Sequence, residues 1–310
     1  MLPHLALAID LGGTKVASAL VDSTGQVLTG SRFRHPTGAS SSSEQLADNV
    51  RDLIAETLAA APHGATILGA GIGTAGPIEQ DQGRVSPLNL PAWQSFLLRD
   101  LVAQCIPDLP VTMRVDGLCI TLAEHWVGAG KGFNNVMGMI VSTGVGGGLI
   151  LGGRTVAGGT GNAGHIGHVE VAGYTTPCAC GGTGCLESIA SGPRSVAWAR
   201  EQGWDGTTGE ELSASYEAGN DIARAAIERA GVAIGRAIGS ATALLDLDIA
   251  VIGGGFSNAT PDIFDHIRNG VTESSSLEFV HRVRVVPSSL SDEGPLIGAA
   301  ALVHHADMLN

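Results

Sequence analysis

The sequence has few charged residues and no segment dominated by charge of one sign. Charged residues make up 15% of the 310 residues, whereas hydrophobic residues make up 44%. This composition excludes a disordered chain and predicts an ordered globular protein. The net charge is -13 and no basic stripe is present, which argues against a nucleic acid as the main partner.

Long hydrophobic runs are also missing. No apolar stretch reaches the length needed to cross a membrane, and the N-terminus lacks the charged start and long apolar core of a secretory signal. We therefore expect a cytoplasmic protein without a membrane partner. At 310 residues the chain is long enough for two domains, each with its own core.

Cysteine is scarce, and its distribution is uneven. Three of the five cysteines, Cys178, Cys180 and Cys185, lie within eight residues. In a cytosolic chain this favours a metal site over disulfides. Together with His168 they offer three thiolates and one imidazole, which suit tetrahedral zinc; four protein ligands leave no place for a substrate water, so the zinc would be structural. Three buried free thiols are the alternative.

Glycine is the residue in excess, with 45 copies in short clusters that have no period. Such clusters favour tight turns and close approach of the backbone to ligands. Three of them follow apolar, strand-like runs, where backbone N–H groups can bind phosphate oxygens. The candidate nucleotide-binding residues are Asp10, Gly12, Gly13, Thr14 and Lys15 in the first cluster, Thr143, Gly144 and Gly146 in the second, and Gly253, Gly254 and Gly255 in the third. Simple hairpin turns are the alternative, in which Asp10 caps its turn.

The first two glycine clusters occupy equivalent places in a repeated pattern. An apolar run, a glycine turn and a second apolar run cover residues 5–21, and the same arrangement returns over residues 136–151. This repeat predicts a duplicated α/β unit with a cleft between the copies. Ligands of such sheets bind at the carboxyl ends of the strands.

Local sequence signals predict one helix start and two further strands. Ser41 and Glu44 fit a capping box that would open a helix. Further strands are expected over residues 26–33 and 282–286.

Asp116 is a lone acid between an expected strand and an expected helix. Aspartate is common as a helix N-cap. The functional alternative is a general base that takes the proton of a substrate hydroxyl as it attacks a γ-phosphate. The position alone is compatible with both roles.

These motifs together resemble the ROK family of sugar kinases and repressors over nearly the whole chain. The resemblance is carried by residues 9–15, 71–77 and 89–93, and by residues 164–168 followed by 178–187, which match the family's zinc signature. It implies an actin-like (ribonuclease H-like) α/β fold of two domains with a cleft between them. The expected domains are residues 1–114 plus 294–310, and residues 115–293. A homodimer or homotetramer is also implied.

The resemblance further implies an enzyme that uses Mg²⁺ and ATP to phosphorylate the 6-hydroxyl of a hexose. Asp116 falls on the catalytic base of the family. The implied sugar-binding residues are Gly76, Asn89, Val115, Asp116, His165, His168 and Glu187. The repressor branch carries a helix-turn-helix before the first strand; here that strand begins at Leu5, which favours the kinase.

Two positions depart from the usual pattern of the family. Val115 stands where the family has Asn, and His165 stands where it has Glu; both usual residues bond the sugar, mainly around its 3-hydroxyl. Valine cannot form such a bond, whereas histidine can donate or accept one. Sites that bond a hydroxyl discriminate strongly, so we expect a hexose altered near C3, such as the amino sugar kanosamine, or a cyclitol. Unmodified glucose is the alternative, and a catalytically silent sugar sensor is the alternative of another class.

Overall fold

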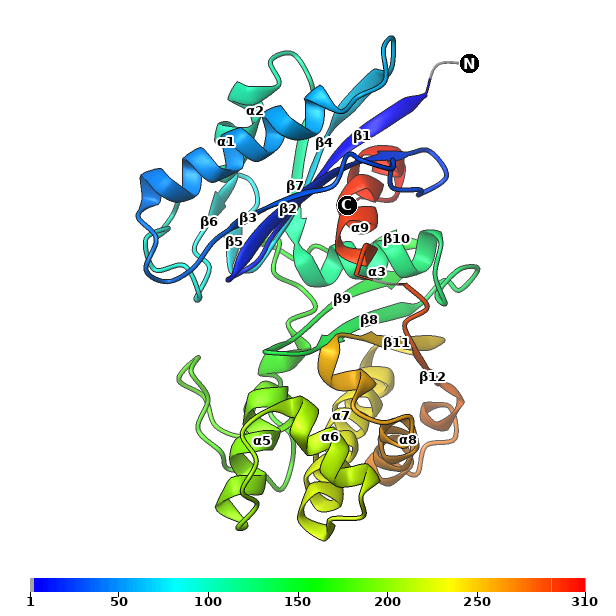
Figure 1. The fold of residues 1–310 in the computed structure, drawn as a ribbon. Helices are drawn as coiled ribbons and strands as arrows, with labels where there is room; N and C mark the ends of the chain where they lie inside the picture. The colour runs from blue at the N-terminus through cyan, green and yellow to red at the C-terminus, as the bar shows by residue number, and fades with distance from the viewer. Residues whose placement is uncertain (1–2, 291, 310) are drawn as a thin grey trace. The chain divides into compact units, whose positions relative to one another are not determined.

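The protein, in a computed structural model that describes residues 3–290 and 292–309, has a mixed α/β fold (Figure 1). Contacts divide the chain into two units, of which the first comprises residues 1–131, 148–164 and 290–310, and the second residues 132–147 and 165–289. The boundaries expected from the sequence differ from these, because they placed residues 115–131, 148–164 and 290–293 in the second domain.

The first unit is built on a five-stranded sheet in the order β3-β2-β1-β4-β7. Its strands are β1 (His4–Leu11), β2 (Lys15–Asp22), β3 (Phe33–Pro36), β4 (Thr66–Thr74) and β7 (Val111–Val115). β1, β2 and β3 are antiparallel neighbours, whereas β1, β4 and β7 are parallel. A small separate sheet pairs β5 (Ile78–Glu79) with β6 (Arg84–Val85).

Helices cover both faces of this sheet. They are α1 (Ser43–Ala59), α2 (Leu98–Cys105), α3 (Asp116–Trp126) and α9 (Gly294–His304). Alternate residues of a strand point to opposite faces, and β1 places leucine and isoleucine in the core that α1 and α2 share. Its other face carries Ala6 and Ala8, which pack with Ala299 and Ala300 of α9. Small residues on both sides let α9 lie close to the sheet, and α3 packs against α9, which explains its place in the first unit.

The second sheet repeats the strand order of the first, as β10-β9-β8-β11-β12. Its strands are β8 (Val136–Val141), β9 (Val145–Leu151), β10 (Arg154–Thr155), β11 (Ile249–Gly253) and β12 (Arg284–Pro287). β11 is parallel to both β8 and β12. Each sheet thus has its first strand in the middle, a hairpin on one side and parallel strands on the other, so the predicted duplication is confirmed.

The helices of the second unit are α4 (Leu186–Ala190), α5 (Gly192–Glu201), α6 (Gly209–Glu217), α7 (Asp221–Leu245) and α8 (Ile263–Ser274). α7 packs against α8, α4, α5 and α6. Short 3₁₀ turns are η1 (Ile166–His168), η2 (Gly255–Asn258), η3 (Val280–Arg282) and, in the first unit, η4 (Ala306–Met308). No helix within the described ranges is long and apolar enough to span a membrane.

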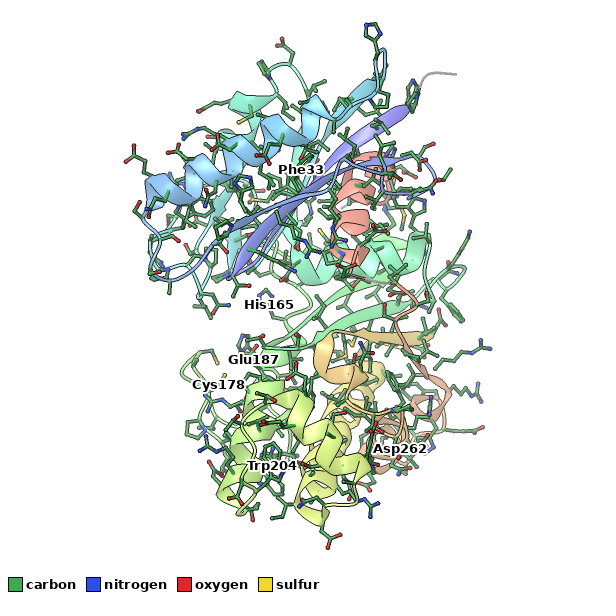
Figure 2. The ribbon with its side chains drawn as sticks, viewed as in Figure 1. Phe33, His165, Cys178, Glu187, Trp204 and Asp262 are labelled. Atoms are coloured by element: carbon green, nitrogen blue, oxygen red, sulfur yellow. The ribbon has the colours of Figure 1, made fainter. Side chains whose placement is uncertain are left out.

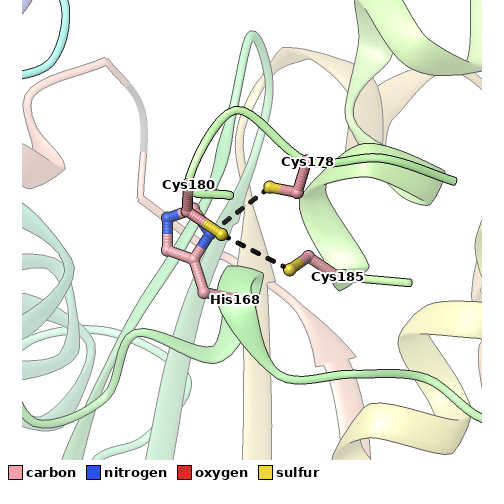
Figure 3. Close-up of side chains that lie close together, drawn as sticks. All are labelled: His168, Cys178, Cys180 and Cys185. Carbon is pink, nitrogen blue, oxygen red and sulfur yellow. Dashed lines mark hydrogen bonds between the residues drawn. The ribbon is translucent and has the colours of Figure 1, made fainter. Parts of the chain in front are cut away.

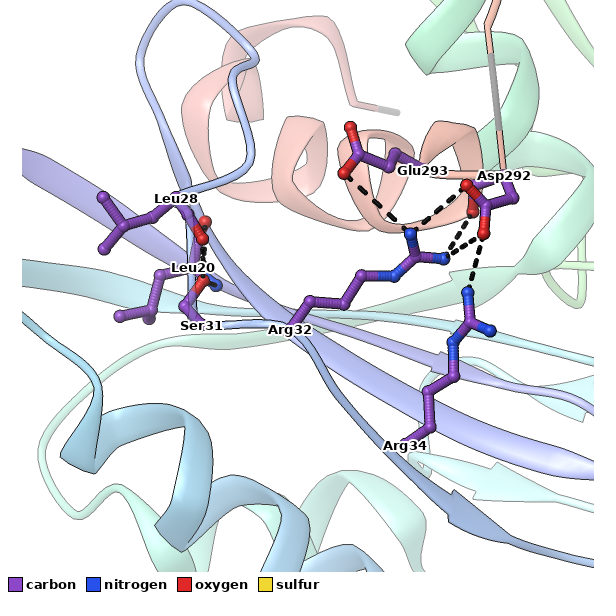
Figure 4. Close-up of polar contacts among 7 residues, drawn as sticks. All are labelled: Leu20, Leu28, Ser31, Arg32, Arg34, Asp292 and Glu293. Atoms are coloured by element: carbon purple, nitrogen blue, oxygen red, sulfur yellow. Dashed lines mark hydrogen bonds and ion pairs between the residues drawn. The ribbon is translucent and has the colours of Figure 1, made fainter.

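Three local predictions are wrong in their bounds. The capping box of α1 joins Ser42 to Gln45 rather than Ser41 to Glu44. The strand expected over residues 26–33 forms only from Phe33, because the Ser31 hydroxyl bonds the backbone of Leu20 and Leu28 and turns the chain there (Figure 4). The last strand begins at Arg284, after the 3₁₀ turn η3.

Two arginines hold the segment that leads into α9 (Figure 4). Arg32 Nη2 and Arg34 Nη2 each lie 2.7 Å from Asp292 Oδ2. Their hydrogen bonds lower the pKa of the Asp292 carboxyl to about 2. The C-terminal helix is therefore fastened to the β3 edge of the first sheet at its start, in addition to its packing on β1.

Candidate active site and metal centre

The four predicted zinc ligands meet in the second unit (Figure 3). Their ligand atoms all lie within 4.8 Å of one another. His168 Nδ1 is 3.7 Å from Cys178 Sγ, and Cys180 Sγ is 3.6 Å from Cys185 Sγ. Tetrahedral zinc with Zn–S bonds of about 2.3 Å places its thiolates about 3.8 Å apart. The residues therefore fit a zinc ion, with the Nδ1 side of His168 turned toward the thiols.

The backbone of the cysteine loop explains how these side chains converge. Cys178 and Gly182 are joined by a backbone hydrogen bond of 2.8 Å, and Val171 bonds Gly184 at 2.8 Å. Burial raises the pKa of the Cys185 thiol to about 12, so this thiol stays protonated until a cation displaces its proton. Cys185 is also the residue from which α4 begins, so the loop fixes the start of the helix that carries Glu187.

Three candidate sugar-binding residues, His165, His168 and Glu187, lie at η1 and α4, which contact each other. Figure 2 labels His165 and Glu187 together with Cys178 of the cysteine loop. The rings of His165 and His168 are nearly parallel, with centroids 6.2 Å apart. Glu187 reaches the second glycine turn, where its Oε2 accepts a hydrogen bond of 2.9 Å from the N–H of Val145. The cysteine loop and the glycine turn are thus joined through one carboxylate.

A cavity of about 580 Å³ lies in the second unit, next to the second and third glycine clusters. This volume is within the range of small-molecule sites. Its lining residues are Ser142, Thr143, Gly192, Pro193, Val196, Thr207, Thr208, Gly209, Glu210, Ser213, Gly255, Phe256, Asn258 and Ala259. Thr143 and Gly255 were predicted to bind nucleotide, whereas the walls from α5 and α6 were not recognised in the sequence.

Among the described residues that line this cavity, Glu210 is the one that carries a charge. The adjacent Glu211 caps α6, because it accepts hydrogen bonds from the N–H groups of Thr207 and Thr208. A Thr-x-x-Glu pattern at residues 208–211 was the one sequence signal for this wall. An acidic and otherwise neutral lining suits the nucleoside part of a nucleotide better than its phosphates.

The other nucleotide candidates of the second unit lie around this cavity without lining it. Gly144 and Gly146 belong to the turn and start of β9, Gly253 ends β11, and Gly254 precedes η2.

The first unit holds a pair of carboxylates at the carboxyl ends of β1 and β7. Burial raises the pKa of Asp10 to about 7, and the negative charge of Asp116 contributes to this shift. Asp116 is the first residue of α3, and its Oδ1 accepts a hydrogen bond of 2.7 Å from the N–H of Gly117. Val115 holds the N-cap position, so the N-cap role considered for Asp116 is wrong. A carboxylate whose pKa is raised by burial and by a neighbouring carboxylate is typical of functional sites.

The first glycine turn contacts another candidate residue. Gly12 N–H donates to the Lys15 carbonyl at 2.9 Å, which closes the turn, and the carbonyl of Thr14 accepts from Thr37. A β-carbon built on Gly13 would lie 2.6 Å from Asn89 Cβ, so the turn and Asn89 are in close contact.

The remaining two candidates are Gly76, which is half-buried, and Val115, which is buried. Gly76 precedes a cis proline, Pro77, at the end of β4. The side chain of Val115 is 2% exposed and packs in the core of the first unit, so it faces hydrophobic residues.

Comparisons with known proteins agree with this organisation. A model described as ROK family matches residues 6–306. A glucokinase of Thermotoga maritima is 30% identical over 97% of this chain and 98% of its own length. An N-acetylmannosamine kinase of Yersinia pseudotuberculosis is 32% identical over 95% of this chain and 96% of its own.

Solved structures give the same result. A ROK hexokinase from Thermus thermophilus aligns with a TM-score of 0.85 and 28% identity, over 98% of this chain and 99% of the other. A ROK glucokinase from Streptomyces griseus, in complex with glucose and AMPPNP, aligns with a TM-score of 0.81 and 28% identity, over 97% and 99%. The predicted family and actin-like fold are confirmed, and the chain belongs to the ROK family, as a sugar kinase.

Proposed function

We propose that this kinase transfers the γ-phosphoryl group of Mg-ATP to the 6-hydroxyl of a hexose. The observation that carries the proposal is the pair of carboxylates, Asp10 and Asp116, at the ends of two strands of one sheet. Asp116 would take the proton of the attacking hydroxyl, and Asp10 would lie near the metal ion that neutralises the phosphates. Mg²⁺, when bound, supplies charge stabilisation for the transferred group.

The donor would bind with its nucleoside in the cavity of the second unit and its phosphates near the glycine turns. Thr143 and Gly255 line the cavity and also belong to two of the glycine clusters. Their backbone N–H groups would serve the phosphates, because no Lys or Arg lines the cavity. Zinc would act only as a structural ion that holds His168 and Glu187 in place.

The acceptor would differ from glucose near C2 or C3, and we favour an acylamino hexose altered at C2, such as N-acetylmannosamine. A relative of this chain is named as a kinase of that sugar. His165 can donate a hydrogen bond to an amide carbonyl or accept one from an amide N–H. The ammonium group of a 3-amino sugar such as kanosamine would gain more from a carboxylate, so kanosamine ranks second and unmodified glucose third.

A kinase assay over a sugar panel tests this proposal. N-acetylmannosamine, kanosamine, glucose and mannose would be compared by kcat/KM from ADP release, and ³¹P NMR would identify the phosphorylated position. We expect N-acetylmannosamine to be preferred at least about tenfold and the product to be a 6-phosphate. A clear preference for glucose would contradict the acylamino assignment. A lack of ADP release with every sugar of the panel would indicate the silent sensor.

The oligomeric state stays a prediction. A homodimer or homotetramer is what the resemblance implies, and light scattering coupled to size-exclusion chromatography would measure the mass in solution.

A further inference from the structure

The second glycine turn has an interaction that a phosphate-binding loop does not require. The N–H of Val145 donates to Glu187 Oε2 at 2.9 Å, so one of the donors of the turn already holds an anion from the protein itself. Among the described residues this is the one hydrogen bond that the Glu187 carboxylate forms. Its second oxygen, Oε1, forms no hydrogen bond with the described residues.

Gly144 makes this contact possible. A β-carbon built on Gly144 would lie 2.7 Å from Glu187 Oε2, a separation at which something must shift. Gly146, two residues further along, has open space where its β-carbon would be. A β-carbon on Gly144 would therefore meet the carboxylate of α4, whereas one on Gly146 would meet no described atom within 4 Å.

We propose that the glycine turn positions the sugar through Glu187, with Gly144 as the positioning residue. The Val145 N–H fixes Oε2, which directs Oε1 to a hydroxyl of the sugar. This inference rests on the proposed function, because it takes Glu187 as a sugar ligand. It assigns to Gly144 a role in sugar binding, whereas the sequence pattern alone suggested a role in phosphate binding.

Gly144 matters for sugar binding because loss of the hydrogen bond from the Val145 N–H would leave the Glu187 carboxylate without a fixed orientation. A hydrogen bond to a charged group stabilises its partner more than a neutral one does, and it also restricts the rotamers of a long side chain. An alanine at position 144 would push Oε2 away from the Val145 N–H. The Glu187 carboxylate would then lack a fixed direction, and the sugar would lose a preorganised acceptor.

Gly144→Ala tests the proposal, with Gly159→Ala as its control at an exposed glycine outside the candidate site. Sugar binding would be measured by calorimetry without nucleotide, using N-acetylmannosamine and glucose as probes, and steady-state KM values would follow for sugar and ATP. For Gly144→Ala we expect the sugar Kd and KM to rise about ten- to hundredfold, with the KM for ATP within about twofold. For Gly159→Ala we expect the sugar Kd to stay within about twofold, because its β-carbon would meet no described atom within 4 Å.

The outcomes separate this inference from the proposed function. Wild-type protein that binds neither probe would contradict both. Wild-type binding that Gly144→Ala leaves unchanged, or a rise in the KM for ATP alone, would overturn only the role of Gly144.

Thermal unfolding and zinc content show whether the variant is folded. If Gly144→Ala does not fold, Glu187→Asp replaces it, because the shortened side chain cannot reach both the Val145 N–H and the sugar. An unchanged sugar Kd in that variant would equally overturn the proposal. Glu187→Gln keeps an oxygen for the Val145 N–H and should retain more sugar affinity than Glu187→Asp.

Discussion

The two glycine turns of the duplicated sheets share a backbone pattern but differ in the source of their acid. The first turn follows β1, which carries its own carboxylate, Asp10. The second follows β8, has no acid of its own, and receives Glu187 from α4. In both turns a glycine leaves room for a predicted sugar-binding side chain, which is Asn89 at Gly13 and Glu187 at Gly144. The repeated turn thus provides space, and neighbouring segments provide the chemistry.

Replacement of the base candidate has the largest expected effect and tests the acids of the first unit. Asp116→Asn keeps the size of the side chain but removes the proton acceptor, so kcat should fall about 10²–10⁴-fold while sugar binding persists. ADP release and calorimetry measure the two quantities. Asp100→Asn, at an exposed acid in α2, is the control. Activity of Asp116→Asn within threefold of wild type would remove Asp116 from the chemistry.

Removal of zinc should affect the second turn and spare the first. Cys180→Ser deletes an exposed ligand, so the change removes a metal contact and little core packing. We expect loss of the bound zinc and a weakening of sugar binding of about tenfold or more, since the loop orients His168 and the start of α4. Metal analysis and calorimetry provide the measurements. Cys105→Ser, outside the loop, should keep its zinc; equal zinc loss in both variants would contradict the ligand assignment.

The first turn should show the same dependence on a small residue as the second. Gly13→Ala would place a β-carbon 2.6 Å from Asn89 Cβ, so the turn or Asn89 must move. We expect the sugar KM to rise about tenfold. Gly12→Ala is the control, because its β-carbon would be 3.4 Å from the Lys15 carbonyl, near ordinary contact. If both variants raise the KM for ATP alone, Gly13 does not support sugar binding, and the two turns share only their backbone pattern.

The burial of Asp10 should lower the free energy of unfolding at neutral pH. Burial raises the pKa of Asp10 from 3.8 to about 7, so the folded state holds a proton that the unfolded state has released. The free energy of unfolding therefore falls as pH rises from about 4 to about 7. Asp10→Asn should remove this dependence and be more stable than wild type at pH 8, on the order of 2–4 kcal/mol, with little difference near pH 4.

Urea unfolding across this pH range, without nucleotide and Mg²⁺, measures the effect, because a bound cation would itself favour the charged carboxylate. A stability difference that is the same at every pH would show that Asp10 does not titrate in this window. Loss of activity together with a gain of stability would place Asp10 among residues kept for function.

Motifs defined by residue spacing along the sequence predicted the metal-ligand cluster and the sheet order well. The His168 and cysteine positions identified the ligand cluster, and the repeated strand–glycine–strand pattern gave the duplicated sheet order. The start of α1 was ambiguous because Ser41 with Glu44 and Ser42 with Gln45 both fit a capping box, and the structure forms the second. The strand near residue 30 failed because the Ser31 hydroxyl satisfies backbone groups that a ladder would otherwise use.

The missed parts of the site are those without a motif. The walls of the cavity come from Pro193 and Val196 on α5 and from the start of α6, residues that meet only after α5 and α6 pack on α7. The burial of Val115 was equally hidden, since a position next to a catalytic candidate does not show which way a side chain faces. The contact of Gly144 with Glu187 joins residues 43 apart, which no local pattern records.

The packing of α9 also constrains the order in which the chain can fold. The alanine face of β1 is covered by a helix that begins at Gly294, after all of the second unit in the sequence. Synthesis proceeds from the N-terminus. The strands of the first sheet are therefore complete early, and its alanine face stays uncovered by α9 during more than half of translation. Shortening the protein at its C-terminus would consequently open the core of its N-terminal half.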